Sequence, residues 1–332
     1  MLYRVFAVVV MCLSSLTFAE TLTPKQAAPS PQQLLQEMAK AVHDRDFSGR
    51  LVYVRGNDMS TLEVLHARID GREYERLTHL DGKLAELIRH GEQLVCVHPD
   101  KTITRLGGRA GVGPLAMQDQ LARSLPEQYE IQIDGQGRVA GRNAWMMHVL
   151  PGDGFRYGYR LWVDTESHLM LRSELVNEKG ESLERLEFIS LDLSPNLKVE
   201  QFAVPAAIAE QALEPVDASV HPQGRLKLET SWLPDGFVAA AGDLRLTSGE
   251  QSPVSSRAFS DGLAAFTVFV ERLPEQSIQD GISQMGPTVA LTKRIADEGG
   301  EWLVTLVGEV PPDTAQKILA GLSLSNTLRD GE

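Results

Sequence analysis

Cysteine is almost missing from the sequence, which has two in 332 residues, Cys12 and Cys96. We expect Cys12 to leave with an N-terminal export segment, so that a single thiol remains in the mature chain. One thiol cannot form an internal disulfide, which excludes a small disulfide-stabilised scaffold. Cys96 lies in a β-favouring run, residues 94–97, and we expect a buried strand residue rather than a redox site.

The sequence also lacks an excess of basic residues. It has 32 Lys and Arg against 45 Asp and Glu, and its formal net charge is −13. A negative chain repels nucleic-acid phosphates and anionic lipid surfaces, so we expect no nucleic-acid partner. The charge favours a partner with basic patches, although a solvated acidic surface explains it without any partner.

The N-terminal apolar run is too short to span a membrane comfortably, which takes about 20 residues. It covers residues 5–16, follows Arg4 and leads to Ala19. A basic start, a short apolar middle and a small residue at the end are typical of a secretory signal. We expect residues 1–19 to be cleaved, which removes Arg4 and changes the net charge from −13 to −14. The product is then exported; an uncleaved membrane anchor is the alternative.

Catalytic signatures are missing as well. None of the eight histidines pairs with another at a zinc-binding helix spacing. His66, His79 and His98 lie in neighbouring predicted strands and could converge, but separate roles as strand-surface or turn residues explain them better. No Gly-x-Ser-x-Gly elbow occurs. Acidic residues such as Glu73 and Glu75 lie near arginines, which favours ion pairs on the solvent face over acid–base catalysis. We expect no enzyme, no catalytic residue, no cofactor and no metal.

One glycine-rich string imitates a nucleotide-binding loop, because it follows a possible strand and opens a predicted helix. A dinucleotide fingerprint belongs in a parallel strand-helix-strand unit, whereas this helix leads into short hairpins. We therefore interpret the string as a mobile loop and, if a cavity lies beside it, as a candidate flap. The flap glycines are Gly107, Gly108, Gly111 and Gly113.

A long series of short strands dominates what the sequence does contain. After a helical pattern at residues 32–44, alternation with a period of two predicts roughly nine to eleven antiparallel strands with one apolar face. Only this helix and a second one, residues 114–125, are available to cover that face. Strong curvature of the sheet resolves the mismatch. We expect an α+β fold whose half-barrel domain, residues 31–204, follows a polar lead at residues 20–30.

Such a half-barrel can enclose an apolar cavity between the sheet and its helices, but a fully packed interior explains the same pattern. Within residues 155–163 the alternation predicts one continuous strand, with Arg156 and Arg160 on its polar face. The candidate ligand-binding residues are Met117, Leu121, Leu125, Trp145, Phe155, Tyr157 and Tyr159.

A second, smaller α+β domain is predicted at residues 225–325. The strand pattern fades after Phe202, and the proline-containing residues 205–224 have the composition of a linker. The predicted elements of this domain are strands near residues 225–228, 264–271, 289–294 and 302–307 and a closing helix at residues 312–322.

With these elements laid out, many short strings resemble the RseB/MucB family of periplasmic regulators. In order they include residues 47–49, 66–68, 75–77, 80–82, 159–164, 171–173, 232–234, 259–264 and 307–311. The order of so many strings is far more specific than any one of them.

The resemblance implies a lipoprotein-carrier-like half-barrel and a regulatory role. Members of the family bind the periplasmic segment of a single-span anti-sigma factor and shield it from the site-1 protease. Lipid or lipopolysaccharide is thought to loosen the complex, and by linkage such a ligand weakens partner binding as much as the partner weakens ligand binding. The alternatives are a carrier or scavenger of lipid-modified molecules and, disfavoured by the missing nucleophile, an envelope hydrolase. The sequence leaves open whether the chain forms a homo-oligomer.

Overall fold

The computed structural model describes residues 28–82, 85–91, 93–100, 102–106, 121, 125, 127–204, 226–240, 245–248, 253–273, 280–297 and 300–326. Several expectations therefore lie outside the described residues: the signal peptide at residues 1–19, the four flap glycines, Met117 and the linker at residues 205–224. No helix within the described ranges is both long enough and apolar enough to cross a membrane.

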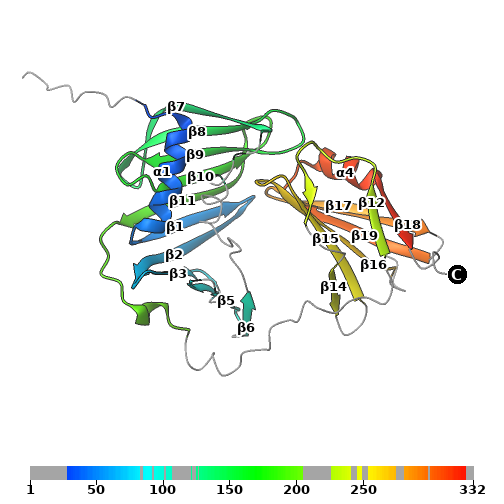
Figure 1. The fold of residues 1–332 in the computed structure, drawn as a ribbon, viewed down its shortest axis with the longest axis horizontal. Coiled ribbons are helices and arrows are strands. Elements are labelled where there is room, and N and C mark those ends of the chain that lie inside the picture. Colours follow the sequence, from blue (N-terminus) through cyan, green and yellow to red (C-terminus); the bar gives the residue numbers. More distant parts are fainter. Residues whose placement is uncertain are drawn as a thin grey trace, which may run out of the picture.

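Eleven antiparallel strands form the sheet of the first domain (Figure 1). Their order is β6-β5-β4-β3-β2-β1-β11-β10-β9-β8-β7, so two meanders meet where β1 pairs with β11. The strands are β1 (Phe47–Arg55), β2 (Asp58–Ile69), β3 (Arg72–His79), β4 (Glu86–His90), β5 (Gln93–Val97), β6 (Ile103–Leu106), β7 (Tyr129–Val139), β8 (Arg142–Pro151), β9 (Gly158–Asp164), β10 (Met170–Val176) and β11 (Ser182–Asp192).

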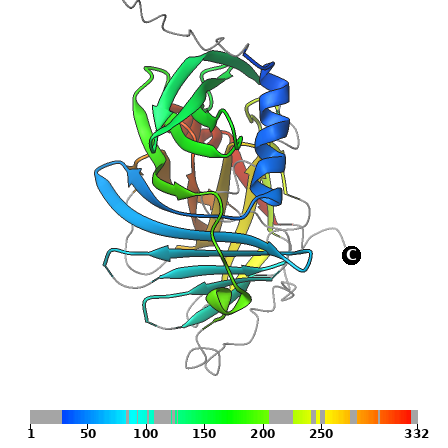
Figure 2. The same ribbon diagram turned by 90° about the vertical axis from the view of Figure 1, so that its left-hand side faces the viewer.

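The sheet curves around helix α1 (Pro31–Asp44), which lies along one face (Figure 2). The helix begins at a capping box in which Ser30 and Gln33 each bond the other's backbone. Leu34 and Met38 pack with strand residues of β7 to β10, and Ala41 and Val42 pack with β1, β2 and β11. Register shifts in β1 and β7 mark bulges, which increase local twist.

A short 3-10 helix, η1 (Val199–Phe202), covers part of the opposite face of this sheet. Phe202 is fully buried there, with its ring 5.5 Å from that of Tyr74, and its carbonyl oxygen lies 2.7 Å from Nε2 of His90. The buried Phe202 therefore holds the C-terminal end of the first domain against the sheet.

Within its described residues, the second domain contains an antiparallel sheet, a two-stranded β12–β20 pair and one helix. Its core is rich in aromatic and branched residues such as Phe237, Phe259, Phe266 and Ile318. The elements are β12 (Leu226–Thr230), β13 (Val238–Ala239), β14 (Arg245–Ser248), β15 (Pro253–Ser260), β16 (Ala265–Arg272), β17 (Gly281–Met285), β18 (Thr288–Asp297), β19 (Gly300–Gly308), α4 (Pro312–Ala320) and β20 (Leu322–Asn326). The expected fold class, an α+β chain with a curved antiparallel half-barrel and a smaller second domain, is confirmed.

Two predicted boundaries were wrong. The closing helix ends at Ala320 rather than Leu322, because Gly321 caps it and Leu322 already pairs with Thr230 in the β12–β20 ladder. The continuous strand expected at residues 155–163 begins only at Gly158. Asp153 explains this difference, since its carboxylate binds the backbone N–H of Phe155 and the side chain of Arg156 and so holds a loop before β9.

Candidate functional site

A buried ion-pair group, the interdomain hub, joins the two domains and consists of Arg156, Asp153 and Asp261. The Arg156 side chain is 0% exposed and lies in the β8–β9 loop of the first domain. The guanidinium donates to both carboxylate oxygens of Asp153 at 3.1 and 2.9 Å and, across the interface, to Asp261 at 2.5 Å and to the Asp235 carbonyl at 2.7 Å. Its planar fork therefore fixes three segments from two domains at once. The sequence prediction that Arg156 lies on the solvent face was wrong.

Asp261 is held from both sides of the interface. Its Oδ1 accepts the backbone N–H groups of Leu263 and Ala264 in its own turn, and its Oδ2 also accepts the hydroxyl of Tyr129 at 3.1 Å. The side chain is 0% exposed, like that of Arg156. A buried carboxylate with this many donors is fully satisfied, so the group fixes the orientation of the domains.

An aromatic contact extends this hub toward α4. The rings of Phe155 and Trp232 meet edge to face at 5.1 Å, and Nζ of Lys317 lies 3.9 Å from the Trp232 ring centroid and 4.8 Å from that of Phe155. Cation–π contacts of this kind favour a fixed stack. Gly236 lies nearby at φ +87°, and a Cβ there would lie 2.7 Å from the Gln128 side chain, so the amide end of Gln128 in the first domain packs against the Gly236 backbone of the second.

A second interdomain contact lies at the tip of the β1–β2 hairpin. Gly56 in that turn approaches Gly286 in the β17–β18 turn, and Arg55 contacts both Thr288 and Glu309 of the second domain. The two domains therefore touch at two separate places.

A cleft of about 650 Å³ lies between the domains, with walls from both. Its residues include carboxylates, a lysine and several apolar side chains and prolines. The lining residues are Leu150, Pro151, Asp153, Gly154, Arg156, Tyr157, Gly158, Val176, Asn177, Glu178, Lys179, Leu183, Gln284, Pro311, Pro312 and Asp313. The hydroxyl of Tyr157 is buried and has no hydrogen-bond partner among the residues that the structure describes, and burial raises the pKa of Tyr157 to about 12. An apolar wall with a few convergent polar groups is typical of a binding site.

The candidate ligand-binding residues fall into two places. Leu121, Trp145 and the partly buried Leu125 and Tyr159 pack in one core cluster with Leu34 and Met38 of α1. Phe155 lies in the interdomain stack and Tyr157 in the cleft wall. The structure therefore brings four of these residues together under α1 and separates two from them; a ligand-lining role stays a prediction for all.

A polar cluster interrupts the α1-facing side of the sheet at β2 to β4. His66 is buried, stacks on Phe47 at 4.9 Å and contacts the Arg45 carbonyl at 2.9 Å and Glu73 at 3.4 Å. The hydrogen bonds from His43 and His66 hold the pKa of Glu73 well below its ordinary value. The cluster links the end of α1 to β3.

Glu75 in this cluster contradicts the expectation of solvent-facing carboxylates with ordinary pKa values. Its side chain is buried, with Oε2 3.4 Å from Nε of Arg89, and Oε1 has no hydrogen-bond partner in the described part of the chain. Burial raises the pKa of Glu75 although Arg89 opposes the shift. The sequence did not indicate which face of β3 this residue occupies.

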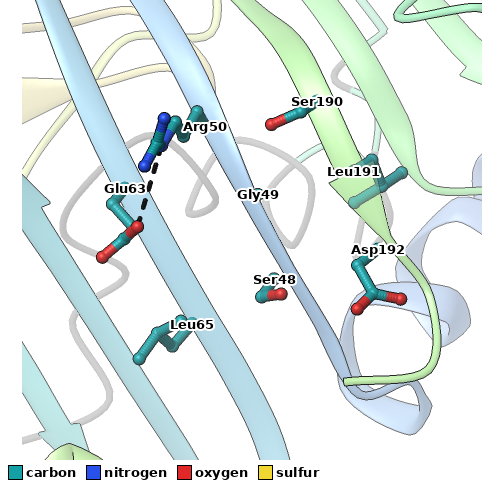
Figure 3. Close-up of a pocket in the computed structure, with 8 residues that line it drawn as sticks. All are labelled: Ser48, Gly49, Arg50, Glu63, Leu65, Ser190, Leu191 and Asp192. Carbon is teal, nitrogen blue, oxygen red and sulfur yellow. Dashed lines mark ion pairs between the residues drawn. The ribbon is translucent and has the colours of Figure 1, made fainter.

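The face of the sheet that points away from α1 carries a shallow hollow of about 290 Å³ (Figure 3). Its lining residues are Ser48, Gly49, Arg50, Glu63, Leu65, Ser190, Leu191 and Asp192. Figure 3 shows Arg50 and Glu63 pairing at the rim, with Nε and Oε1 3.9 Å apart. Exposed pairs this long contribute little, so the interdomain cleft is the stronger candidate site.

Neither metal nor redox chemistry gains support from the described part of the chain. It contains no group of three or more His, Cys, Asp or Glu arranged to hold a metal ion. Cys96 lies in strand β5, as predicted, but it is half-buried rather than fully buried.

Two family models match this chain and together cover nearly all of the described structure. The MucB/RseB N-terminal domain matches residues 30–215, and the MucB/RseB C-terminal domain matches residues 222–323. The chain belongs to the MucB/RseB family. A family relative from Pseudomonas aeruginosa, sigma factor AlgU regulatory protein MucB, is 34% identical over 89% of this chain and 91% of its own length. The sigma-E factor regulatory protein RseB of Escherichia coli is 29% identical over 88% and 90%.

Solved structures of MucB share the fold. MucB in complex with MucA(peri) is 32% identical, with a TM-score of 0.70 over 88% of this chain and 98% of that one. A MucA/MucB complex from Pseudomonas aeruginosa is 30% identical, with a TM-score of 0.72 over 89% and 99%. A structure of MucB is 28% identical, with a TM-score of 0.59 over 89% and 98%.

The hub residues Arg156, Asp153 and Asp261 were not singled out from the sequence. Two signals were present: Asp261 and Trp232 lie within strings that carry the family resemblance, residues 259–264 and 232–234. Neither string by itself says that its residues meet the β8–β9 loop.

Proposed function

We propose that this chain is a periplasmic regulator that binds the periplasmic segment of a transmembrane anti-sigma factor. The observation that carries the proposal is similarity across both domains to MucB, which is named as an AlgU regulatory protein and is seen in complex with MucA(peri). The two matched family domains span residues 30–215 and 222–323, and these ranges contain the residues of the hub and the cleft. The relatives are named as regulators, which supports a binding function rather than catalysis.

The interdomain cleft is our candidate for the binding site of the anti-sigma segment. Its volume of about 650 Å³ lies within the usual range of about 300–1,000 Å³ for binding pockets. Leu150, Val176 and Leu183 supply apolar surface, while Glu178 and Asp313 supply negative charge. A segment with an apolar anchor flanked by basic side chains complements this lining.

The finer steps of the mechanism are also proposals. Binding shields the anti-sigma segment from site-1 proteolysis, because a bound segment is withheld from a protease that needs an extended, accessible chain. A lipid or lipopolysaccharide-type ligand that prefers the unbound form releases the segment through linkage. The α1-facing cluster around Trp145 and Tyr159 is our candidate for the acyl-chain site, with Leu121 and Leu125 beside it.

Binding of a synthetic anti-sigma segment to the purified full chain, measured by calorimetry, tests the proposal. We expect Glu178→Lys combined with Asp313→Lys to weaken binding at least about tenfold, or about 1.4 kcal/mol. Glu130→Lys, a charge reversal at an exposed residue of β7 outside the cleft lining, is the control and should change affinity less than about twofold.

Two outcomes count against the proposal. If the wild-type chain does not bind the segment but copurifies with lipid, a lipid-carrier function replaces the regulatory function as the proposal. If the segment binds and the cleft variant keeps wild-type affinity, the cleft is not its site.

A further inference from the structure

A three-charge cluster at one end of the cleft joins the domains. Arg55 of β1 lies between two carboxylates: its Nε is 3.9 Å from Oε2 of Glu184 on β11, and its Nη2 is 3.6 Å from Oε1 of Glu309, which follows β19. One guanidinium is thus shared by carboxylates from different domains. With both carboxylates ionised the cluster carries one excess negative charge.

The two carboxylates are not equally satisfied. Glu184 accepts the hydroxyl of Tyr53 at 2.7 Å, and Arg55 also donates to Thr288. Among the described residues Glu309 makes no side-chain hydrogen bond and has only the long ion pair with Arg55. Arg76 and Glu86, by contrast, pair at 2.6 Å. Glu309 is therefore the weakly held charge of the cluster.

The surroundings of Glu309 disfavour its ionised form. Partial burial raises its pKa and the negative charge of Glu184 raises it further, while Arg55 opposes both. The other titratable groups that sense Glu309 are Tyr53, Tyr157 and Tyr159, whose hydroxyl pKa values are raised mainly by burial, so they stay neutral. Uptake of one proton by Glu309 leaves the cluster without net charge.

We propose that Arg55, Glu184 and Glu309 form an acid-tightened latch, in which protonation of the cluster favours the docked arrangement of the two domains. If the carboxyl pKa is higher in the docked state than in the undocked state, protonation favours docking. Its contribution to docking is fully present below the ordinary glutamate value of 4.5 and is lost as the pH rises through the docked-state pKa.

The latch and the cleft share their walls. Leu183 precedes Glu184, Pro311 and Pro312 follow Glu309 closely, and Tyr157 lines the cleft while it senses the charge of Glu309. Opening the latch therefore changes the width of the cleft. The consequence that pH regulates partner affinity rests on the proposed function; the latch itself does not.

Distances between spin labels on the full chain test the latch. In the chain without residues 1–19, which lacks Cys12, Cys96→Ser removes the remaining thiol. Arg138→Cys and Ser323→Cys then place labels at exposed sites, one in each domain. Measured from about pH 5 to about pH 8, the docking constant should fall as the pH rises, by at most about tenfold per pH unit for a single proton. Glu309→Gln should stay docked across this range, and Glu301→Gln, an exposed carboxylate away from the cluster, should behave like wild type.

The Arg156 hub would hide the response if it keeps the wild-type chain fully docked, so the same series is repeated with Arg156→Lys, which weakens the hub. A docked population that is independent of pH in both backgrounds overturns the latch, as does a Glu309→Gln variant with an unchanged pH response.

Calorimetry with the anti-sigma segment at about pH 5 and about pH 8 separates the latch from the proposed function. A pH-dependent docking equilibrium without any segment binding contradicts the proposed function alone, and segment binding without pH-dependent docking contradicts the latch alone.

Discussion

Replacing Arg156 with methionine is the sharpest test of the interdomain hub. Methionine keeps much of the aliphatic volume and removes a guanidinium that makes hydrogen bonds to Asp153, Asp261 and the Asp235 carbonyl. Asp261, 0% exposed, then keeps its turn N–H groups and Tyr129 but loses its countercharge. Removal of one partner from a buried ion pair typically costs about 3–5 kcal/mol, because an uncompensated charge stays buried.

Calorimetric unfolding measures this loss. We expect Arg156→Met to lower stability by about 3–5 kcal/mol and to separate the unfolding of the two domains into distinct transitions. Arg138→Met, an exposed arginine on β7, is the matched control and should stay within about 0.5 kcal/mol of wild type.

A double-mutant cycle with Asp261→Asn assigns the effect to the pair. The neutral amide removes the buried charge, so the double variant should lose less than the sum of the single variants, with a coupling of about 2–3 kcal/mol. Additivity within about 0.5 kcal/mol, or a single unfolding transition with wild-type stability in Arg156→Met, would refute the reasoning that this ion pair holds the domains together.

Three further predictions follow from buried groups. Burial raises the pKa of Glu75, so its contribution to the free energy of unfolding is lost as the pH rises through the folded-state pKa. In denaturant titrations the free energy of unfolding of wild type, relative to that of Glu75→Gln, should therefore fall from about pH 5 to about pH 8. The pKa of Glu73 is lowered, so its contribution is present above the ordinary value of 4.5 and lost as the pH falls below it; Glu73→Gln should cost least in acid, and an unchanged cost there contradicts the assignment. In Gly49→Ala the new Cβ would lie 2.4 Å from the Ser190 carbonyl oxygen, and we expect a thermal-denaturation loss of about 1–3 kcal/mol, whereas Gly154→Ala meets nothing within 4 Å and should be nearly neutral.

The first domain followed from the sequence because its information is local. Alternation along β7 and β8 fixes which residues face α1, and short turns between strands permit only antiparallel neighbours. The stripe Leu34, Met38 and Ala41 specified α1 in the same way. Curvature followed from a mismatch in apolar area between many strands and few helices, which the periodic patterns of the sequence reveal.

The second domain was harder to predict because its elements depend on partners. The strands that were missed are β13, β14, β15, β17 and β20. Polar residues alternate with few apolar ones in β15, and all five residues of β17 are exposed, so neither shows a strong apolar face. Leu322 fits a helical stripe as well as a strand, and only the ladder with Thr230 decides between them.

The interdomain site could not be predicted from the sequence, for a different physical reason. Arg156 and Asp261 are 105 residues apart, and an arginine in an alternating run is assigned to solvent unless its countercharge is known. The candidate lining residues were chosen by the same alternation, which carries no information about the loop that Asp153 imposes before β9. Contacts that join separately folded units leave no periodic signal in either one.

Protection of the partner tests the central claim most directly. A reconstituted transmembrane anti-sigma factor is incubated with its site-1 protease, with and without this chain, and cleavage is followed over time. The account predicts that the full chain slows cleavage in proportion to the fraction of partner bound and that the Glu178→Lys, Asp313→Lys variant loses this protection together with its affinity. Cleavage at the same rate with saturating wild-type protein present would contradict it.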